Sequence, residues 1–172
     1  MTVEPDTKDW TWVIEKRCPD CGFDAAAVPL ATLPDLLRAN AAAWSAVLAR
    51  PTVRDRPEPG TWSPLEYGCH VRDACRVFTE RLTLMLSQDD PRFANWDQDA
   101  TAVEQDYSGQ DPVRVDADLR RNAGAIADAF AAVRADQWER TGRRSNGSVF
   151  TVATLARYFA HDPVHHLHDV GG

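Results

Sequence analysis

Four stretches of this chain carry apolar residues at the spacing of one helical face, and no other feature constrains the fold as strongly. The pattern predicts helices over residues 33–49, 64–87, 116–135 and 151–168, separated by segments rich in proline and glycine. Residues 91–113 form a long connection with a helical turn or two near 99–106. Four amphipathic helices with one long crossover connection predict an all-α four-helix bundle.

The starts of two helices are marked by capping signals. Ser63, followed by Pro64 and by Glu66 three residues after the cap, forms a capping box with proline in the first turn. Thr32 and Pro34 mark the first helix in the same way. The bundle therefore covers residues 32–172.

Residues 1–31 differ from the rest and are interpreted as an N-terminal arm that lies on the bundle. Residues 10–15 predict a short extended segment, and residues 18–24 predict a turn rich in loop-forming residues. The first residues are acidic and polar, without the basic and apolar regions of a secretory signal, so we expect a cytoplasmic protein.

Charge and hydropathy restrict the classes of partner. The formal net charge is −7, from 19 basic and 26 acidic residues, whereas nucleic-acid binders carry a basic face that neutralises phosphates. The chain also lacks a run of about 18 apolar residues, the length that a membrane span requires. We therefore expect a small-molecule substrate, with no nucleic-acid partner and no membrane segment.

The histidines have an uneven distribution that predicts a metal site. Four of the five lie at positions 161–168, and the fifth is His70 on the second helix. His161 and His165 stand four residues apart, so they project from one helix face and are close enough to bind one ion. His70 is the one histidine on another helix, so it is the candidate third ligand. Spacing alone leaves an alternative open, in which the terminal histidines form a solvated helix end and His70 hydrogen-bonds in the core.

Other polar residues are candidates for supporting roles. Asp73 and Asp162 are candidates to accept the free N–H of a ligand histidine. Tyr158 and Arg157 are candidates to orient a substrate, and His166 is predicted to be a packed core residue.

The residues resemble a known family. The segment GlyThrTrpSerPro at 60–64, the following helix with His70, and the last helix with its H-x3-H resemble the DinB/YfiT-like superfamily over residues 32–170. The resemblance implies a four-helix bundle of DinB/YfiT type, often a homodimer, with one Zn²⁺, Ni²⁺ or Mn²⁺ ion on three histidines. The matching positions are His70, His161 and His165.

The same resemblance implies an activity. Its members include S-transferases and a maleylpyruvate isomerase that use a low-molecular-weight thiol such as mycothiol or bacillithiol. Our first hypothesis is therefore a metal-dependent thiol S-transferase, in which the ion lowers the pKa of a bound thiol. The second is a non-catalytic metal-binding or stress-response protein.

Cys18 and Cys21 support a third hypothesis, a redox or zinc module in the arm. A zinc ribbon would need a second CxxC, and a thioredoxin-like motif would need a βαβ unit; the sequence has neither. A shared metal and a labile disulfide stay open, but we favour a simple turn. Cys69 and Cys75 are predicted to be packed in the bundle.

Overall fold

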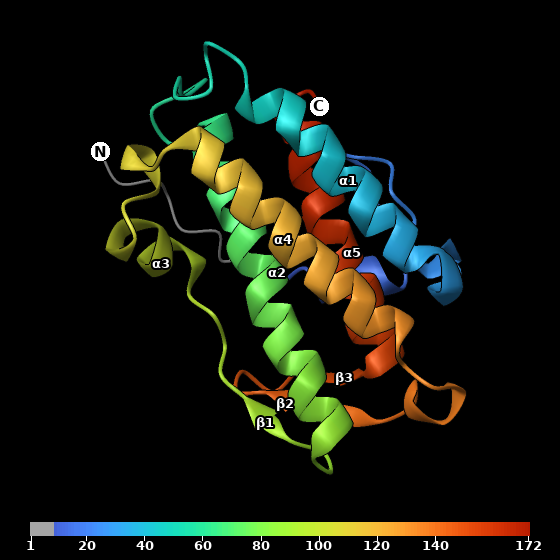
Figure 1. Cartoon of the computed structure of the whole chain (residues 1–172). Coiled ribbons are helices and arrows are strands. Elements are labelled where there is room, and N and C mark those ends of the chain that lie inside the picture. The colour runs from blue at the N-terminus through green and yellow to red at the C-terminus, as the bar shows by residue number, and fades with distance from the viewer. Residues whose placement is uncertain (1–8) are drawn as a thin grey trace.

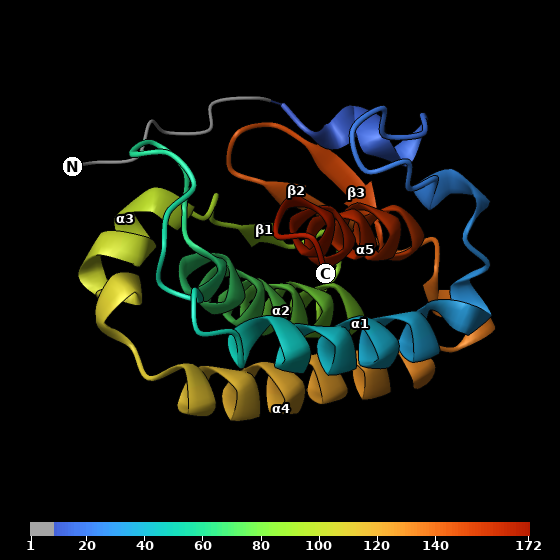
Figure 2. The same cartoon turned by 90° about the horizontal axis from the view of Figure 1, so that it is seen from above.

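A computed structural model describes residues 9–172 and contains four long helices: α1 (Leu33–Leu48), α2 (Pro64–Ser87), α4 (Pro112–Ala131) and α5 (Val152–Asp169) (Figure 1). α4 packs against both α1 and α2, and α5 packs against the same two helices from the opposite side (Figure 2). The predicted four-helix bundle is confirmed.

The bundle core consists of buried apolar side chains from all four helices. The large side chains with almost no solvent exposure include Trp44, Leu65, Leu82, Leu119, Phe130 and Phe159. None of the helices within residues 9–172 is long and apolar enough to cross a membrane.

The long connection between α2 and α4 is partly ordered into short elements. It holds the strand β1 (Arg92–Phe93), the short helix α3 (Gln98–Glu104) and a 3₁₀ turn at Tyr107–Gly109. The position of α3 agrees with the helical turns expected near residues 99–106.

A small sheet lies at one end of the bundle, and the sequence did not predict it. β2 (Thr141–Arg144) pairs in parallel with β1 and antiparallel with β3 (Val149–Thr151). Strands of two to four residues are too short to display the alternation that identifies a strand. Gly142 fits the close approach of β2 to α2, because a Cβ there would lie 2.7 Å from the side chain of Met85.

Two local predictions were wrong. Residues Thr11–Ile14 form a 3₁₀ helix rather than an extended segment. α4 begins at Pro112 and ends at Ala131, about one turn earlier than the predicted 116–135, because Asp111 caps it by accepting a hydrogen bond from the Val113 N–H.

Further 3₁₀ turns at Ala25–Ala27 and Leu30–Thr32 continue the arm along α5 to α1 (Figure 2).

The N-terminus of α2 has the predicted capping box. Ser63 Oγ accepts a hydrogen bond from the Glu66 N–H at 3.3 Å, and the Glu66 carboxylate accepts one from the Ser63 N–H at 2.8 Å. The same carboxylate is buried and also pairs with the Arg56 guanidinium. Burial alone would raise the pKa of Glu66, but the hydrogen bonds from Arg56 and Ser63 outweigh it and hold the pKa below its ordinary value.

We predict that Glu66→Gln destabilises the fold by roughly 1.5–3 kcal/mol at pH 7, the usual value of hydrogen bonds to a charged group. Because the pKa is lowered in the folded state, this stabilisation is present above the ordinary glutamate pKa of about 4.3 and is lost as the pH falls through the folded pKa. Urea unfolding from pH 7 to pH 3 should show the two proteins converging in acid. Glu80→Gln, at an exposed pair with Arg76, is the control and should change stability little. A constant difference between Glu66→Gln and wild type at every pH would contradict this account.

Candidate functional site

α5 carries the candidate metal ligands in two pairs. His161 and His165 lie four residues apart on one face, and Asp162 and His166 lie four residues apart on the next face. An offset of one residue turns a side chain by about 100° around a helix, so the two pairs point in different directions. The helix runs unbroken through Pro163, whose carbonyl accepts a hydrogen bond from the Asn40 side chain at 3.0 Å.

The first cluster joins α5 to α2 and consists of His70, Asp162 and His166. One ligand atom from each of these residues lies within 4.8 Å of the others. Oδ2 of Asp162 is 3.2 Å from Nε2 of His70 and 3.9 Å from Nε2 of His166. The carboxylate oxygen thus lies between two imidazole nitrogens. The other nitrogen of His166, Nδ1, is 3.1 Å from a carboxylate oxygen of Asp169.

This cluster has the features of a site that binds a cation. His70 is fully buried and stacks on Trp96 with ring centroids 5.2 Å apart. Burial would raise the pKa of Asp162, but the neighbouring His70 and the other histidines lower it to about 2. Nδ1 of His70 and Oδ1 of Asp162 are buried without a hydrogen-bond partner among the described residues. Such atoms are uncommon in a folded protein, and they accord with a functional site for an ion.

The second cluster joins α5 to the arm and consists of Cys18, Cys21, His161 and His165. One ligand atom from each of the four residues lies within 4.8 Å of the others. Sγ of Cys18 is 3.6 Å from Nδ1 of His165, and Sγ of Cys21 is 3.7 Å from Nε2 of His161. The indole ring of Trp10 covers both histidines, with centroid distances of 5.7 and 5.2 Å.

Burial disfavours the charged forms of His161, His165 and Cys21. Burial and the neighbouring His165 lower the pKa of His161 to about 4. Burial also lowers the pKa of His165 and raises the pKa of the Cys21 thiol. Neutral imidazole is the form of histidine that binds a metal.

The structure does not bring His70, His161 and His165 to one point, as the sequence analysis expected. It divides them between the two clusters, because residues 161 and 165 face the arm and residues 162 and 166 face α2. His166, expected in the core, instead lies against His70 with ring centroids 4.9 Å apart. The D-x3-H spacing of Asp162 and His166 is the sequence signal that indicates this second pair on α5.

Cys18 and Cys21 lie in a turn, as favoured from the sequence. Their sulfur atoms also face the histidines of α5. In the sequence, C-x2-C together with a distant H-x3-H is the pattern that could have indicated this grouping of cysteines and histidines.

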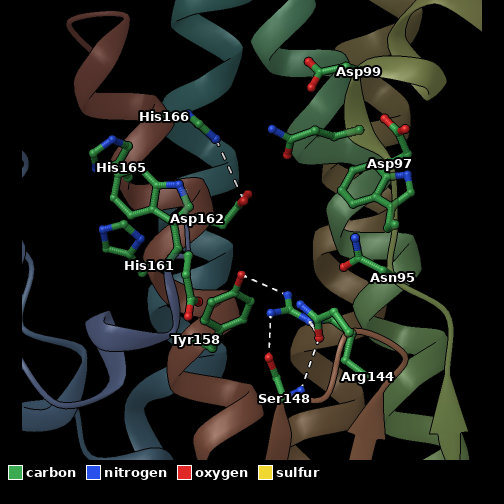
Figure 3. A pocket seen from close by; sticks show the side chains of 15 residues that line it. Asn95, Asp97, Asp99, Arg144, Ser148, Tyr158, His161, Asp162, His165 and His166 are labelled. Atoms are coloured by element: carbon green, nitrogen blue, oxygen red, sulfur yellow. Dashed lines mark hydrogen bonds and ion pairs between the residues drawn. The ribbon is translucent and has the colours of Figure 1, made fainter. Parts of the chain in front are cut away.

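A pocket of about 580 Å³ opens beside both clusters (Figure 3). Its wall contains charged and polar side chains from the arm, the α2–α4 connection, the β2–β3 hairpin and α5, including the histidines of both clusters on α5: Asp9, Asn95, Asp97, Gln98, Asp99, Arg144, Asn146, Ser148, Tyr158, His161, Asp162, His165 and His166. Arg144 donates hydrogen bonds to Ser148 Oγ at 3.0 Å and to Tyr158 Oη at 3.4 Å. The guanidinium is thus held at the wall of a pocket that four carboxylates also line.

The remaining predicted residues fall in different places. Tyr158 lines the pocket. Arg157 is not among the lining residues, and its Nε is buried without a partner among the described residues. Asp73 is buried away from the pocket, where it accepts hydrogen bonds from Tyr107 Oη at 2.6 Å and from the Arg72 guanidinium. Burial and this carboxylate raise the pKa of Tyr107, so its hydroxyl remains a donor.

Comparisons with known proteins agree with this architecture. The family model of the DinB superfamily matches residues 35–170. The chain belongs to the DinB superfamily. A solved structure, described as YfiT from Bacillus subtilis, "a probable metal-dependent hydrolase with an unusual four-helix bundle topology", is similar with a TM-score of 0.65 at 16% sequence identity. The match covers 99% of this chain and 92% of YfiT. A comparison with curated proteins gives no significant match.

We predict that Asp73→Asn lowers stability by roughly 3–5 kcal/mol, because it leaves the buried Arg72 without its ion-pair partner. Metal content of the folded protein should stay at the wild-type level, since Asp73 contacts neither cluster. Denaturant unfolding together with elemental analysis checks both points. Loss of metal from a variant of unchanged stability would instead assign Asp73 to a metal site.

Proposed function

We propose that this protein is a metal-dependent enzyme whose ion is held by His70, Asp162 and His166. The observation that carries the proposal is the position of the Asp162 carboxylate between Nε2 of His70 and Nε2 of His166, at the wall of a large pocket. Three protein ligands leave at least one coordination position for a substrate, as in catalytic sites. Zn²⁺, Ni²⁺ and Mn²⁺ all accept imidazole and carboxylate ligands.

A divalent ion at this position supplies a nucleophile, because it lowers the pKa of a bound thiol or water. The residues of the chain prepare the position for it. Trp96 stacks on His70 and Asp169 accepts from Nδ1 of His166, so both rings are held in place. The low pKa of Asp162 keeps its carboxylate charged at neutral pH.

We propose that the nucleophile is a low-molecular-weight thiol, such as mycothiol, that attacks an electrophilic carbon of the substrate. The thiol gives up its proton to solvent, and a sulfur–carbon bond forms as the leaving group departs with its bonding electron pair. The pocket, at about 580 Å³, is within the range of sites that enclose a drug-sized ligand, whereas a water molecule needs about 30 Å³. Arg144 is placed to bind an anionic or carbonyl group, because its guanidinium stands at the pocket wall beside Tyr158.

Hydrolysis is the second candidate, and it is favoured by the likeness in fold to YfiT, which is described as a probable metal-dependent hydrolase. The same ligand set would serve it, with water in the place of the thiol. A non-catalytic metal-binding protein is the alternative to both.

The test combines metal content with turnover. We expect His70→Ala and Asp162→Ala to lose the ion and to lower turnover of a bimane electrophile with mycothiol or bacillithiol by more than about 100-fold, the upper end of the loss from an outer partner alone. His168→Ala is the matched control, because this side chain is 55% exposed at the end of the same helix. It should keep both metal and turnover.

Three results would contradict the proposed function, either its ligand set or its thiol-transfer chemistry. Turnover that persists in His70→Ala would show that the ligand set is wrong. Metal-dependent cleavage of p-nitrophenyl esters without any thiol would favour the hydrolase. Bound metal without either activity would favour the non-catalytic protein.

A further inference from the structure

The arm contains a tight loop that places two sulfur atoms on the same side. The Cys18 N–H donates to the Phe23 carbonyl at 2.9 Å, and the Gly22 N–H donates to the Cys18 carbonyl at 3.0 Å. Gly22 has a φ of 72°, a conformation that glycine adopts without strain. The Arg17 guanidinium fixes the loop further by donating to the Gly22 carbonyl at 2.6 Å. The loop therefore holds both thiols in position before any ligand binds.

The histidines of α5 complete a set of four donors around one point. Cys18, His161 and His165 are at least 92% buried, and Cys21 is half-buried. A tetrahedral ion with Zn–S bonds of about 2.3 Å and Zn–N bonds of about 2.1 Å holds sulfur and nitrogen roughly 3.6 Å apart. The two sulfur–nitrogen distances of the cluster are 3.6 and 3.7 Å. These distances match neighbouring ligands of one zinc ion.

We propose that Cys18, Cys21, His161 and His165 bind a structural Zn²⁺ ion, separate from the ion of the pocket. Four protein ligands of the Cys₂His₂ type close the coordination sphere, which is the arrangement of structural rather than catalytic zinc. Two thiolates balance the charge of the ion, so the complex is neutral and fits a buried position. Mixed thiolate and imidazole ligands favour zinc over magnesium, calcium or manganese.

The surroundings of the cluster support an ion here. His165 points Nδ1 at the sulfur of Cys18 and has its other nitrogen, Nε2, 3.6 Å from the Asp169 carboxylate. A carboxylate at the outer nitrogen is the usual partner of a metal-bound histidine, because it fixes the tautomer and the ring orientation. The indole of Trp10 packs beside both histidine rings, with ring centroids 5.7 Å from His161 and 5.2 Å from His165.

The zinc ion would fasten the arm to the last helix. Cys18 and His165 are 147 residues apart in the sequence, so the ion closes a very long loop and restricts the unfolded chain. Asp9 and Trp10 of the arm line the pocket, so an arm fixed by zinc also completes one wall of that pocket. The ion therefore organises the site without taking part in the chemistry.

Substitution of Co²⁺ for zinc tests the proposal, because cobalt bound by thiolate absorbs in the near ultraviolet. We expect the metal-reconstituted wild type to show this band, and the double variant Cys18→Ser with Cys21→Ser to lose it together with about one equivalent of metal per chain. His70→Ala should keep the band, since His70 belongs to the other cluster. Cys69→Ala is the matched control, because it removes a buried cysteine of α2 that lies outside the cluster, and it should also keep the cobalt band.

A second measurement uses the wild-type chain, so it does not depend on how the variants fold. Zinc should protect two thiols from a disulfide reagent and should slow tryptic cleavage after Lys16 and Arg17, and a chelator should reverse both effects. Three results would overturn the proposal. The first is an undiminished cobalt band in the double cysteine variant, and the second is no band in the wild type. The third is a Cys18–Cys21 disulfide, found by mass analysis in protein that was purified with zinc under reducing conditions. Loss of the band in His70→Ala, with the cysteine variant unaffected, would place the only ion in the pocket and leave the proposed function standing.

Discussion

The spacing of side chains on α5 is the constraint on which the candidate chemistry depends. Residues four apart on a helix share a face, and an offset of one residue turns the face by about 100°. α5 uses both properties, since His161 and His165 face the arm while Asp162 and His166 face α2. Each pair is then completed by candidate ligands from a different segment, His70 for one and the CxxC loop for the other. About one and a half turns of α5 thus supply two of the three candidate donors of one cluster and two of the four of the other.

The two clusters are linked by one carboxylate. Asp169 Oδ2 lies 3.1 Å from Nδ1 of His166 and 3.6 Å from Nε2 of His165, so it contacts one histidine of each cluster. Such an outer partner fixes the rings of both histidines. The number of ligands separates the proposed roles: three donors leave a position open to a substrate, and four close the site. In the proposed arrangement, the closed site would fasten the arm whose Trp10 and Asp9 border the pocket served by the open site.

The sequence predicted the bundle because the information is local. Apolar periodicity, the capping box at Ser63 and Pro34 in the first turn of α1 located α1, α2 and α5 to within about a residue or two. The side-chain cap expected from Thr32 is absent, because its hydroxyl donates to the Pro29 carbonyl instead. The small sheet escaped prediction because its strands are two to four residues long and pair residues far apart in the chain. The candidate metal ligands were recognised by residue type, but the way they assemble depends on which segment packs against each face of α5. H-x3-H and D-x3-H have the same spacing, so spacing alone does not indicate which of the two pairs packs against the arm.

Metal sites of this kind are decided by direct observation of the ions. An anomalous difference map at the zinc absorption edge, from crystals of the zinc-loaded protein, tests whether α5 serves two centres or one. Our account predicts two separate peaks, one among His70, Asp162 and His166 and one among Cys18, Cys21, His161 and His165. A single peak coordinated jointly by His70, His161 and His165 would contradict it.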